Sequence, residues 1–266
     1  MKFSFLFYEP VDNLDDLDRR MGALVAMGYL GVELSAFHPL PFPITAVATL
    51  AEKHRLPVVS LLSGWSYSHE GLCLSSPDAS VRDRAARRLV DYVGQAAALG
   101  AMVVVGLMQG LRTDEPDGKK ANDRIARALG QVCVATAESK VELALEPVNH
   151  LQVGFNHTVA EAISMANRVG SPSMGYMLDT FHMNIEEPSI AAAIRVHSAS
   201  ARHVHLCETN GGRFGGGGLD FGRVLSTLEE VGYDRFVSLK IYRELGWEEA
   251  ARSSAEFLRR LGYGTF

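Results

Sequence analysis

MGYMLD, at residues 174–179, is an apolar run that ends in a carboxylate. Three other segments have the same form, an apolar run followed by a polar side chain: VELALE at 141–146, HVHLCE at 203–208 and FVSLK at 236–240. Short apolar runs of this kind are typical of strands that are buried on both faces, as in a parallel sheet. We therefore predict four buried strands, each of which carries a polar side chain near its end.

Strand-like and helix-like segments alternate along the whole chain. Eight strands that alternate with eight helices favour an α/β fold, a (β/α)8 TIM barrel that spans residues 1–266 as a single domain. An open doubly wound sheet is the alternative, but it usually has a glycine-rich turn after its first strand, and YEPVDN at 8–13 has no glycine. The predicted strands are residues 3–7, 30–34, 57–62, 102–106, 141–146, 174–179, 203–207 and 236–241, and the predicted helices are residues 14–27, 43–54, 78–99, 122–139, 158–169, 189–198, 221–231 and 247–261, with Asp78 and Thr158 as candidate N-caps.

Composition and charge exclude several classes of protein. Of 266 residues, 47% are apolar and 21% are charged, as in ordinary globular domains. The formal net charge of −5 does not favour a nucleic-acid partner, and no apolar run reaches the roughly 20 residues of a membrane helix. The cysteines, Cys73, Cys133 and Cys207, are scattered without a CxxC spacing, which is typical of a reduced, cytoplasmic protein.

The polar side chains at the strand ends form a candidate site. Glu146, Asp179, His205 and Lys240 follow one another at intervals of about 30 residues, the length of one βα unit. Chemistry in a barrel collects at the carboxyl ends of its strands, so these side chains can converge. Two carboxylates and an imidazole suit Mn²⁺, Mg²⁺ or Co²⁺. The alternative is that they are unrelated polar residues that cap helices or pair with arginine.

Several sequence motifs in this chain resemble those of one enzyme family. ALEPVNH at 144–150 and LDTFHMNIEE at 178–187 resemble the ketose 3-epimerase group of xylose-isomerase-like TIM barrels, which includes D-tagatose and D-psicose 3-epimerases and related keto-sugar epimerases. The likeness extends nearly end to end, through residues 71–85, 103–110 and 217–238. It implies a sugar isomerase or epimerase that acts on a ketose or keto-sugar acid through an enediolate.

The resemblance also implies roles for the strand-end residues. The family holds a divalent metal with a Glu, an Asp, a His and a second Glu, and its two Glu ligands exchange the substrate proton. By motif, Glu146, Asp179 and His205 match the first three ligands. Lys240 stands where the second Glu is expected. The resemblance therefore implies catalytic roles for Glu146 and Lys240, and a divalent metal, Mn²⁺, Mg²⁺ or Co²⁺, on the other three positions.

Residues expected to bind substrate depart from the family pattern at two further positions. His182, in the DTFH word, matches a substrate-contacting histidine, and Glu208 matches an acidic residue three positions after the metal histidine. Gln152 stands where the family has a substrate-binding Glu. Gly211 stands where it has an Arg, and Arg213 is a candidate substitute. Together with Lys240, these departures indicate a substrate other than the standard free ketose.

Other candidates have two interpretations each. Trp65 and His69 follow the third strand and either stack on a sugar or close a loop. The glycine-rich residues 211–218 either cradle a phosphate or form a plain loop. Glu33 ends the second strand as a substrate contact or a helix cap. His203 is better explained as a hydrogen-bonded histidine of the barrel interior.

Lys240 leaves three possibilities open. A metal binds to the other three ligands and Lys240 acts beside it, or Lys240 takes the place of the cation, or the site has lost its chemistry and only binds a sugar. A lyase or dehydratase is the competing enzyme class, since the same enediolate can expel a β-hydroxyl group. The abasic-DNA endonucleases of the same superfamily need more ligands and a basic groove. We expect a small sugar substrate, no nucleic-acid or membrane partner, and a homo-oligomer, either a dimer or a tetramer.

Overall fold

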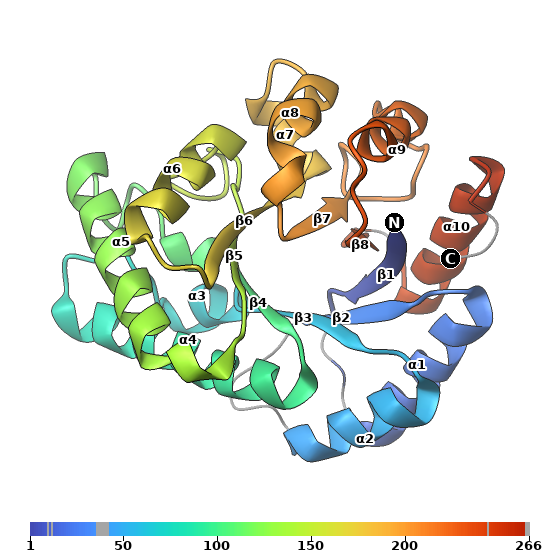
Figure 1. Ribbon diagram of the computed structural model, residues 1–266, viewed down its shortest axis with the longest axis horizontal. Helices are drawn as coiled ribbons and strands as arrows, with labels where there is room; N and C mark the ends of the chain where they lie inside the picture. The colour runs from blue at the N-terminus through green and yellow to red at the C-terminus, as the bar shows by residue number, and fades with distance from the viewer. Residues whose placement is uncertain (10, 12, 36–42, 244, 264–266) are drawn as a thin grey trace.

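The fold is a closed barrel of parallel strands surrounded by helices (Figure 1). The computed structural model describes residues 1–9, 11, 13–35, 43–243 and 245–263. Strand β1 pairs with β2 on one side and with β8 on the other, so the sheet has no edge. The TIM barrel prediction is confirmed, and the open-sheet alternative is wrong. The strands are β1 (Lys2–Phe7), β2 (Gly31–Ser35), β3 (Val58–Leu62), β4 (Met102–Val105), β5 (Leu143–Leu145), β6 (Met174–Asp179), β7 (His203–Leu206) and β8 (Phe236–Leu239).

The helices lie outside the barrel and agree closely with the predicted segments, with two additions. Helices α3 and α7 were missed, because each is only six or seven residues long and follows its strand with almost no loop. Helix α5 begins four residues earlier than predicted, where Asp117 caps it. The helices are α1 (Leu14–Met27), α2 (Ile44–His54), α3 (Trp65–Glu70), α4 (Ala79–Leu99), α5 (Gly118–Ala135), α6 (Val159–Val169), α7 (Thr180–Glu186), α8 (Ile190–His197), α9 (Phe221–Glu230) and α10 (Trp247–Arg260), with short 3-10 turns at Leu107–Gln109, Ala137–Ser139 and Ser198–Ser200.

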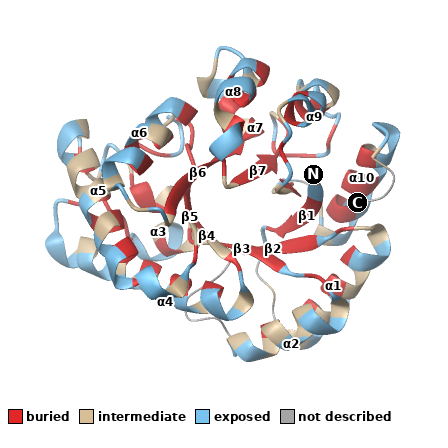
Figure 2. Cartoon of the chain, in the orientation of Figure 1, coloured by how far each residue is buried: buried red, intermediate tan, exposed pale blue. Residues whose placement is uncertain are grey.

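Alternation along the strands divides the core into two layers. Val103 and Val105 of β4 pack in the large cluster between strands and helices, whereas Val104 packs with Ala144 and Met177 in a separate small cluster. Since successive side chains of a strand point to opposite faces, this small cluster lies inside the barrel. Figure 2 shows the buried strands at the centre and helices exposed on their outer faces. No helix among the described residues is long and apolar enough to cross a bilayer.

Helix α6 begins with a reciprocal cap that gives a test of local stability. The Thr158 hydroxyl accepts a hydrogen bond from the backbone N–H of Glu161 (3.2 Å), and the Glu161 carboxylate accepts one from the N–H of Thr158 (3.0 Å). We expect Thr158→Ala to lower the free energy of unfolding by about 1 kcal/mol, because one N–H of the first turn loses its acceptor. Urea denaturation followed by circular dichroism measures the change. Thr158→Ser keeps the hydroxyl and is the control, and equal stability of the two variants would contradict the prediction.

Candidate active site

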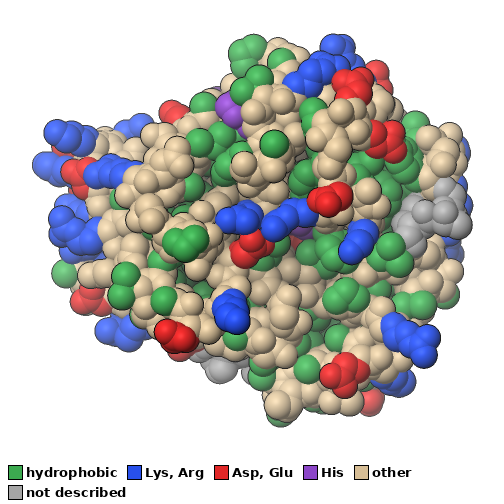
Figure 3. Space-filling model, viewed as in Figure 1, with side chains coloured by type: hydrophobic (Ala, Val, Ile, Leu, Met, Phe, Trp, Pro, Cys, Tyr) green, Lys and Arg blue, Asp and Glu red, His purple; other side chains and the backbone are tan. Residues whose placement is uncertain are grey.

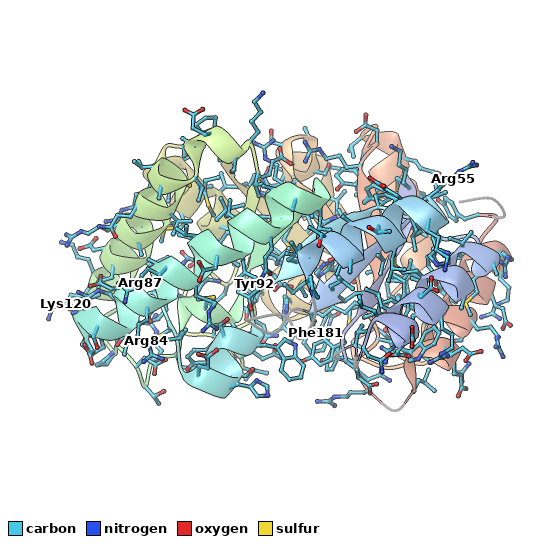
Figure 4. All side chains as sticks on the ribbon, turned by 90° about the horizontal axis from the view of Figure 1, so that it is seen from below. Arg55, Arg84, Arg87, Tyr92, Lys120 and Phe181 are labelled. Carbon is cyan, nitrogen blue, oxygen red and sulfur yellow. The ribbon has the colours of Figure 1, made fainter. Side chains whose placement is uncertain are left out.

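A cavity of about 340 Å³ opens at the carboxyl ends of the strands. In Figure 4 this end of the barrel lies at the bottom, where Phe181 is labelled, and Arg55 marks the opposite end. The wall of the cavity includes these residues that the sequence analysis proposed: Trp65, His69, Glu146, Gln152, His182 and Lys240. Asp179 and His205 lie directly beneath this wall and are fully buried.

The four strand-end residues converge on one point. The Lys240 Nζ lies 2.8 Å from Asp179 Oδ2 and 3.5 Å from Glu146 Oε1. His205 Nδ1 lies 3.4 Å from that same Asp179 oxygen and 3.5 Å from that same Glu146 oxygen. The strand register explains this convergence, because Asp179 pairs with His205 across β6 and β7, and the backbone N–H of Lys240 donates to Leu206 of β7 (2.9 Å).

Gly106 makes room for one of these side chains. It follows β4, and a Cβ atom at this position would collide with the Glu146 carboxylate. The backbone N–H of Glu146 donates to the carbonyl of Val105 (3.0 Å), which aligns Glu146 with the end of β4. The absence of a side chain at Gly106 therefore lets the Glu146 carboxylate turn towards the centre of the barrel.

Electrostatics in this cluster favour charged groups. Burial raises the pKa of both carboxyl groups, but the Lys240 ammonium, together with His205 and His182, holds the pKa of Glu146 below its ordinary value and that of Asp179 well below. Burial also lowers the pKa of Lys240, and the two carboxylates raise it well above its ordinary value. The cluster therefore contains two carboxylates held together by one ammonium.

Glu33 lies beneath this cluster, and its position corrects the sequence analysis. It neither reaches the cavity nor caps a helix, and it is fully buried inside the barrel. Its carboxylate accepts hydrogen bonds from Ser60 (2.7 Å) and Ser238, and contacts His203 and His205. His203 is the hydrogen-bonded interior histidine that we expected.

Contact with Glu33 sets the orientation of His205. The Nε2 atom of His205 lies 3.0 Å from Glu33 Oε2, so this nitrogen donates to the carboxylate and Nδ1 faces Glu146 and Asp179. Burial lowers the pKa of His205, but Glu33 and Asp179 raise it well above its ordinary value. Burial likewise raises the pKa of Glu33, and the two histidines bring it well below its ordinary value.

His182 contacts the same two carboxylates from helix α7. Its Nε2 lies 3.7 Å from Glu146 Oε1 and 4.0 Å from Asp179 Oδ2. The side-chain amide of Asn149 donates to the Nδ1 of His182 (2.7 Å), which leaves the proton of the neutral ring on Nε2. Burial lowers the pKa of His182, so this ring is a neutral hydrogen-bond donor at the cavity wall. The sequence analysis did not predict this role of Asn149, although the residue lies within the ALEPVNH motif.

Two expected substrate-binding residues do not lie at the cavity. The Glu208 carboxylate is fully buried and accepts hydrogen bonds from the backbone N–H groups of Thr209 (2.9 Å), Gly215 (3.2 Å) and Leu219 (3.1 Å). Arg213 is exposed and pairs with Glu249. The expectation that Glu208 and Arg213 bind substrate is therefore corrected: Glu208 holds the glycine-rich loop closed, and its negative charge occupies N–H groups that a phosphate would need.

Aromatic side chains that the sequence analysis did not assign complete the cavity wall. Tyr242 lies 5.5 Å from Tyr8 and 5.8 Å from Phe181 between ring centroids, and all three rings line the cavity. Trp65 and His69 stack on each other at 4.5 Å. Each of these three aromatic residues follows the end of a strand by one to three positions. This position in the sequence could have identified Tyr8, Phe181 and Tyr242 as residues of the cavity wall.

Tyr242 also explains the glycine at 211. The backbone N–H of Tyr242 donates to the carbonyl of Gly211 (3.0 Å), and a Cβ at Gly211 would collide with the Tyr242 ring. Gly211 has a φ of +71°, which disfavours other residues. An arginine at this position, as the family resemblance implies, does not fit beside Tyr242.

Comparison with known proteins places the chain in a family. Residues 21–261 match the family model of the xylose isomerase-like TIM barrel. The chain belongs to this family. It is 32% identical to an L-ribulose 3-epimerase of Mesorhizobium japonicum over 60% of this chain and 54% of that protein. It is 30% identical to a ketose 3-epimerase of Arthrobacter globiformis over 78% of this chain and 71% of that protein. These relatives are isomerases, and the match to the first spans only about half of its length.

Solved structures of family members share the fold. An L-ribulose 3-epimerase superposes with a TM-score of 0.87 at 24% identity, over 98% of this chain and 94% of that one. A D-psicose 3-epimerase from Clostridium cellulolyticum H10, determined with D-tagatose, superposes with a TM-score of 0.83 at 22% identity, over 98% of this chain and 99% of that one. At these identities the likeness concerns the architecture.

The fit of a divalent metal to this site depends on Lys240. Glu146, Asp179 and His182 present ligand atoms within 4.8 Å of one another, which is close enough to hold a metal ion. The Lys240 ammonium, however, contacts the Asp179 and Glu146 oxygens that would ligate the ion. A dication on these oxygens would lie beside a positive charge that strongly repels it. The residues present therefore do not fit a divalent metal as long as Lys240 is charged.

The Glu33 network predicts a large effect on stability. Glu33→Gln removes the buried negative charge that pairs with His205, and breaking such a buried pair costs about 3 kcal/mol or more. Urea denaturation measures the loss. Glu230→Gln is the control, since Glu230 pairs with Arg195 in an exposed contact of the kind that contributes little. Equal stability of the two variants would show that the buried network is not stabilising.

Proposed function

We propose that this protein is a sugar isomerase or epimerase that acts on a ketose or keto-sugar acid and moves a proton on the carbon next to the carbonyl group. Support comes from relatives that are ketose 3-epimerases and from the barrel, which superposes on that of an L-ribulose 3-epimerase. The observation that carries the proposal is the pairing of Glu146 with Lys240 in the wall of one cavity, because proton abstraction next to a carbonyl needs both a base and a positive partner for the oxygen.

Glu146 has the properties of the base. Its carboxylate is ionised, since its pKa is held below the ordinary value, and Oε1 has no hydrogen-bond partner among the described residues. In the proposed step the carbon–hydrogen bond breaks and the proton passes to Glu146. The electron pair moves to the carbonyl oxygen, which becomes the oxyanion of an enediolate.

Lys240 and His182 have the properties of donors to that oxyanion. The ammonium of Lys240 and the Nε2–H of His182 both face the cavity beside Glu146. The Lys240 ammonium is also a proton donor, and it can return a proton to the carbon of the enediolate, which leaves the lysine as a neutral amine. Its 3.5 Å contact with Glu146 then allows the proton on the carboxylic acid to pass to the amine, which restores both groups.

The departures from the family pattern favour a substrate other than the standard free ketose. The family positions for a substrate-binding Glu and Arg are Gln152 and Gly211, so these two positions carry no charge. Tyr242, Tyr8 and Phe181 provide aromatic surface in the cavity wall, on which the apolar face of a sugar ring can pack. The expected oligomer and the cytoplasmic location stay predictions. Figure 3 shows one face of the molecule on which basic and acidic side chains are mixed, without the basic stripe that a nucleic-acid partner would need.

Glu146→Gln tests the proposal. The change is nearly isosteric and removes the base, so we expect turnover to fall at least about 100-fold, the usual scale for such a loss. Exchange of the carbon-bound proton in D₂O, followed by NMR over a panel of ketoses and keto-sugar acids, measures it. Circular dichroism checks the fold, and Glu230→Gln is the matched control. Near-parent exchange by Glu146→Gln would rule out the assigned role, and loss of water from the substrate would indicate a lyase instead.

A further inference from the structure

We propose that the Lys240 ammonium takes the place of a divalent metal in this site, so that the protein binds the oxygens of its substrate and turns it over without one. The part that concerns turnover rests on the proposed function. The part that concerns metal exclusion does not, because it follows from the contacts of Lys240 alone.

The first argument is the position of the amine. The Asp179 Oδ2 and Glu146 Oε1 atoms that approach His205 Nδ1 are the same atoms that contact Lys240 Nζ. A metal at the point where Glu146, Asp179 and His205 converge would bind these three atoms. Two of them are already directed at the ammonium, which lies where their negative charge is concentrated.

The second argument is charge. The change from glutamate to lysine at position 240 adds two positive charges to the protein, which is the charge of a divalent ion. The set Glu146, Asp179 and Lys240 has a net charge of −1, and two glutamates, one aspartate and a divalent ion also sum to −1. The lysine therefore neutralises the buried carboxylates to the same extent as a metal would.

The third argument is that Lys240 is held in place. Its backbone N–H is bonded to Leu206 at the end of β7, and only 7% of the residue is exposed. Removing the ammonium from its two carboxylate partners would leave unpaired charge in a buried site, which is strongly unfavourable. A metal would have to displace this contact before it could bind.

The bound group follows from the chemistry of the amine. An ammonium has three N–H donors, and Lys240 donates one of them to Asp179 Oδ2 at 2.8 Å. A further N–H is available in the cavity to an oxygen of the ligand. A carbonyl that becomes an oxyanion, as in an α-hydroxyketone or keto-sugar acid, is the class of group that this donor would stabilise.

Calorimetric titration with MnCl₂ tests the inference on the full chain after removal of metals with EDTA and dialysis. We expect no detectable binding by the parent at millimolar Mn²⁺. Lys240→Glu should bind Mn²⁺ with a dissociation constant at least about 100-fold below that concentration. The melting temperature should rise with Mn²⁺ in that variant alone. Lys120→Glu, an exposed change of the same type, should behave as the parent. Adding Glu146→Gln to Lys240→Glu should weaken the new binding.

Lys240→Gln covers the case in which three neighbouring carboxylates prevent Lys240→Glu from folding, because it removes the charge without adding another. It should also bind Mn²⁺ more tightly than the parent. Tight binding by the parent, or no gain in either variant, would overturn the inference, and so would parent activity that EDTA removes and Mn²⁺ restores. If the parent excludes Mn²⁺ and Lys240→Glu binds it, but no keto-sugar exchanges its proton, metal exclusion stands and the proposed function fails.

Discussion

Buried charge must be neutralised where it lies, and this barrel meets that constraint in two stacked layers. In the lower layer Glu33 is paired with His203 and His205 and is bonded to Ser60 and Ser238, so that strands β2, β3, β7 and β8 meet at one carboxylate. In the upper layer Lys240 is paired with Asp179 and Glu146. His205 belongs to both layers, since one ring nitrogen faces each. The geometry of the candidate site therefore depends on pairing that extends through the barrel interior.

Asp179 connects this ion cluster to the cavity wall. Its Oδ1 accepts a hydrogen bond from the backbone N–H of Phe181 (2.8 Å) and caps helix α7, while its Oδ2 contacts Lys240. One carboxylate thus orients both the cation and the short helix that carries His182 and Phe181. This double use explains why the strand passes into the helix with no loop. It also means that a change at Asp179 would disturb the cavity-lining histidine, His182, along with the charge pair.

The sequence predicted the parts of the site that follow from fold geometry. Parallel strands in a barrel end at one rim, so the convergence of Glu146, Asp179, His205 and Lys240 could be expected from their spacing alone. The role of Glu33 could not, because its histidine partners lie about 170 residues away and meet it only when the barrel closes. Glu208 shows a different limit. Motif spacing placed it after the right strand, but the direction of its side chain depends on loop N–H groups that no local pattern reveals.

The departures from the family pattern compensate one another in charge. Lysine in place of the fourth ligand adds the two positive charges that a divalent ion would bring. Glutamine for glutamate at 152 removes one negative charge, and glycine for arginine at 211 removes one positive charge, so this second pair of changes cancels. The summed charge of these positions is therefore the same as that which the family pattern implies with its metal, whereas the directional contacts differ. Under the proposed function, a site altered in this way would keep a positive group for the oxyanion and would contact the remainder of the substrate through neutral and aromatic groups, so the proposal combines retained chemistry with a different sugar.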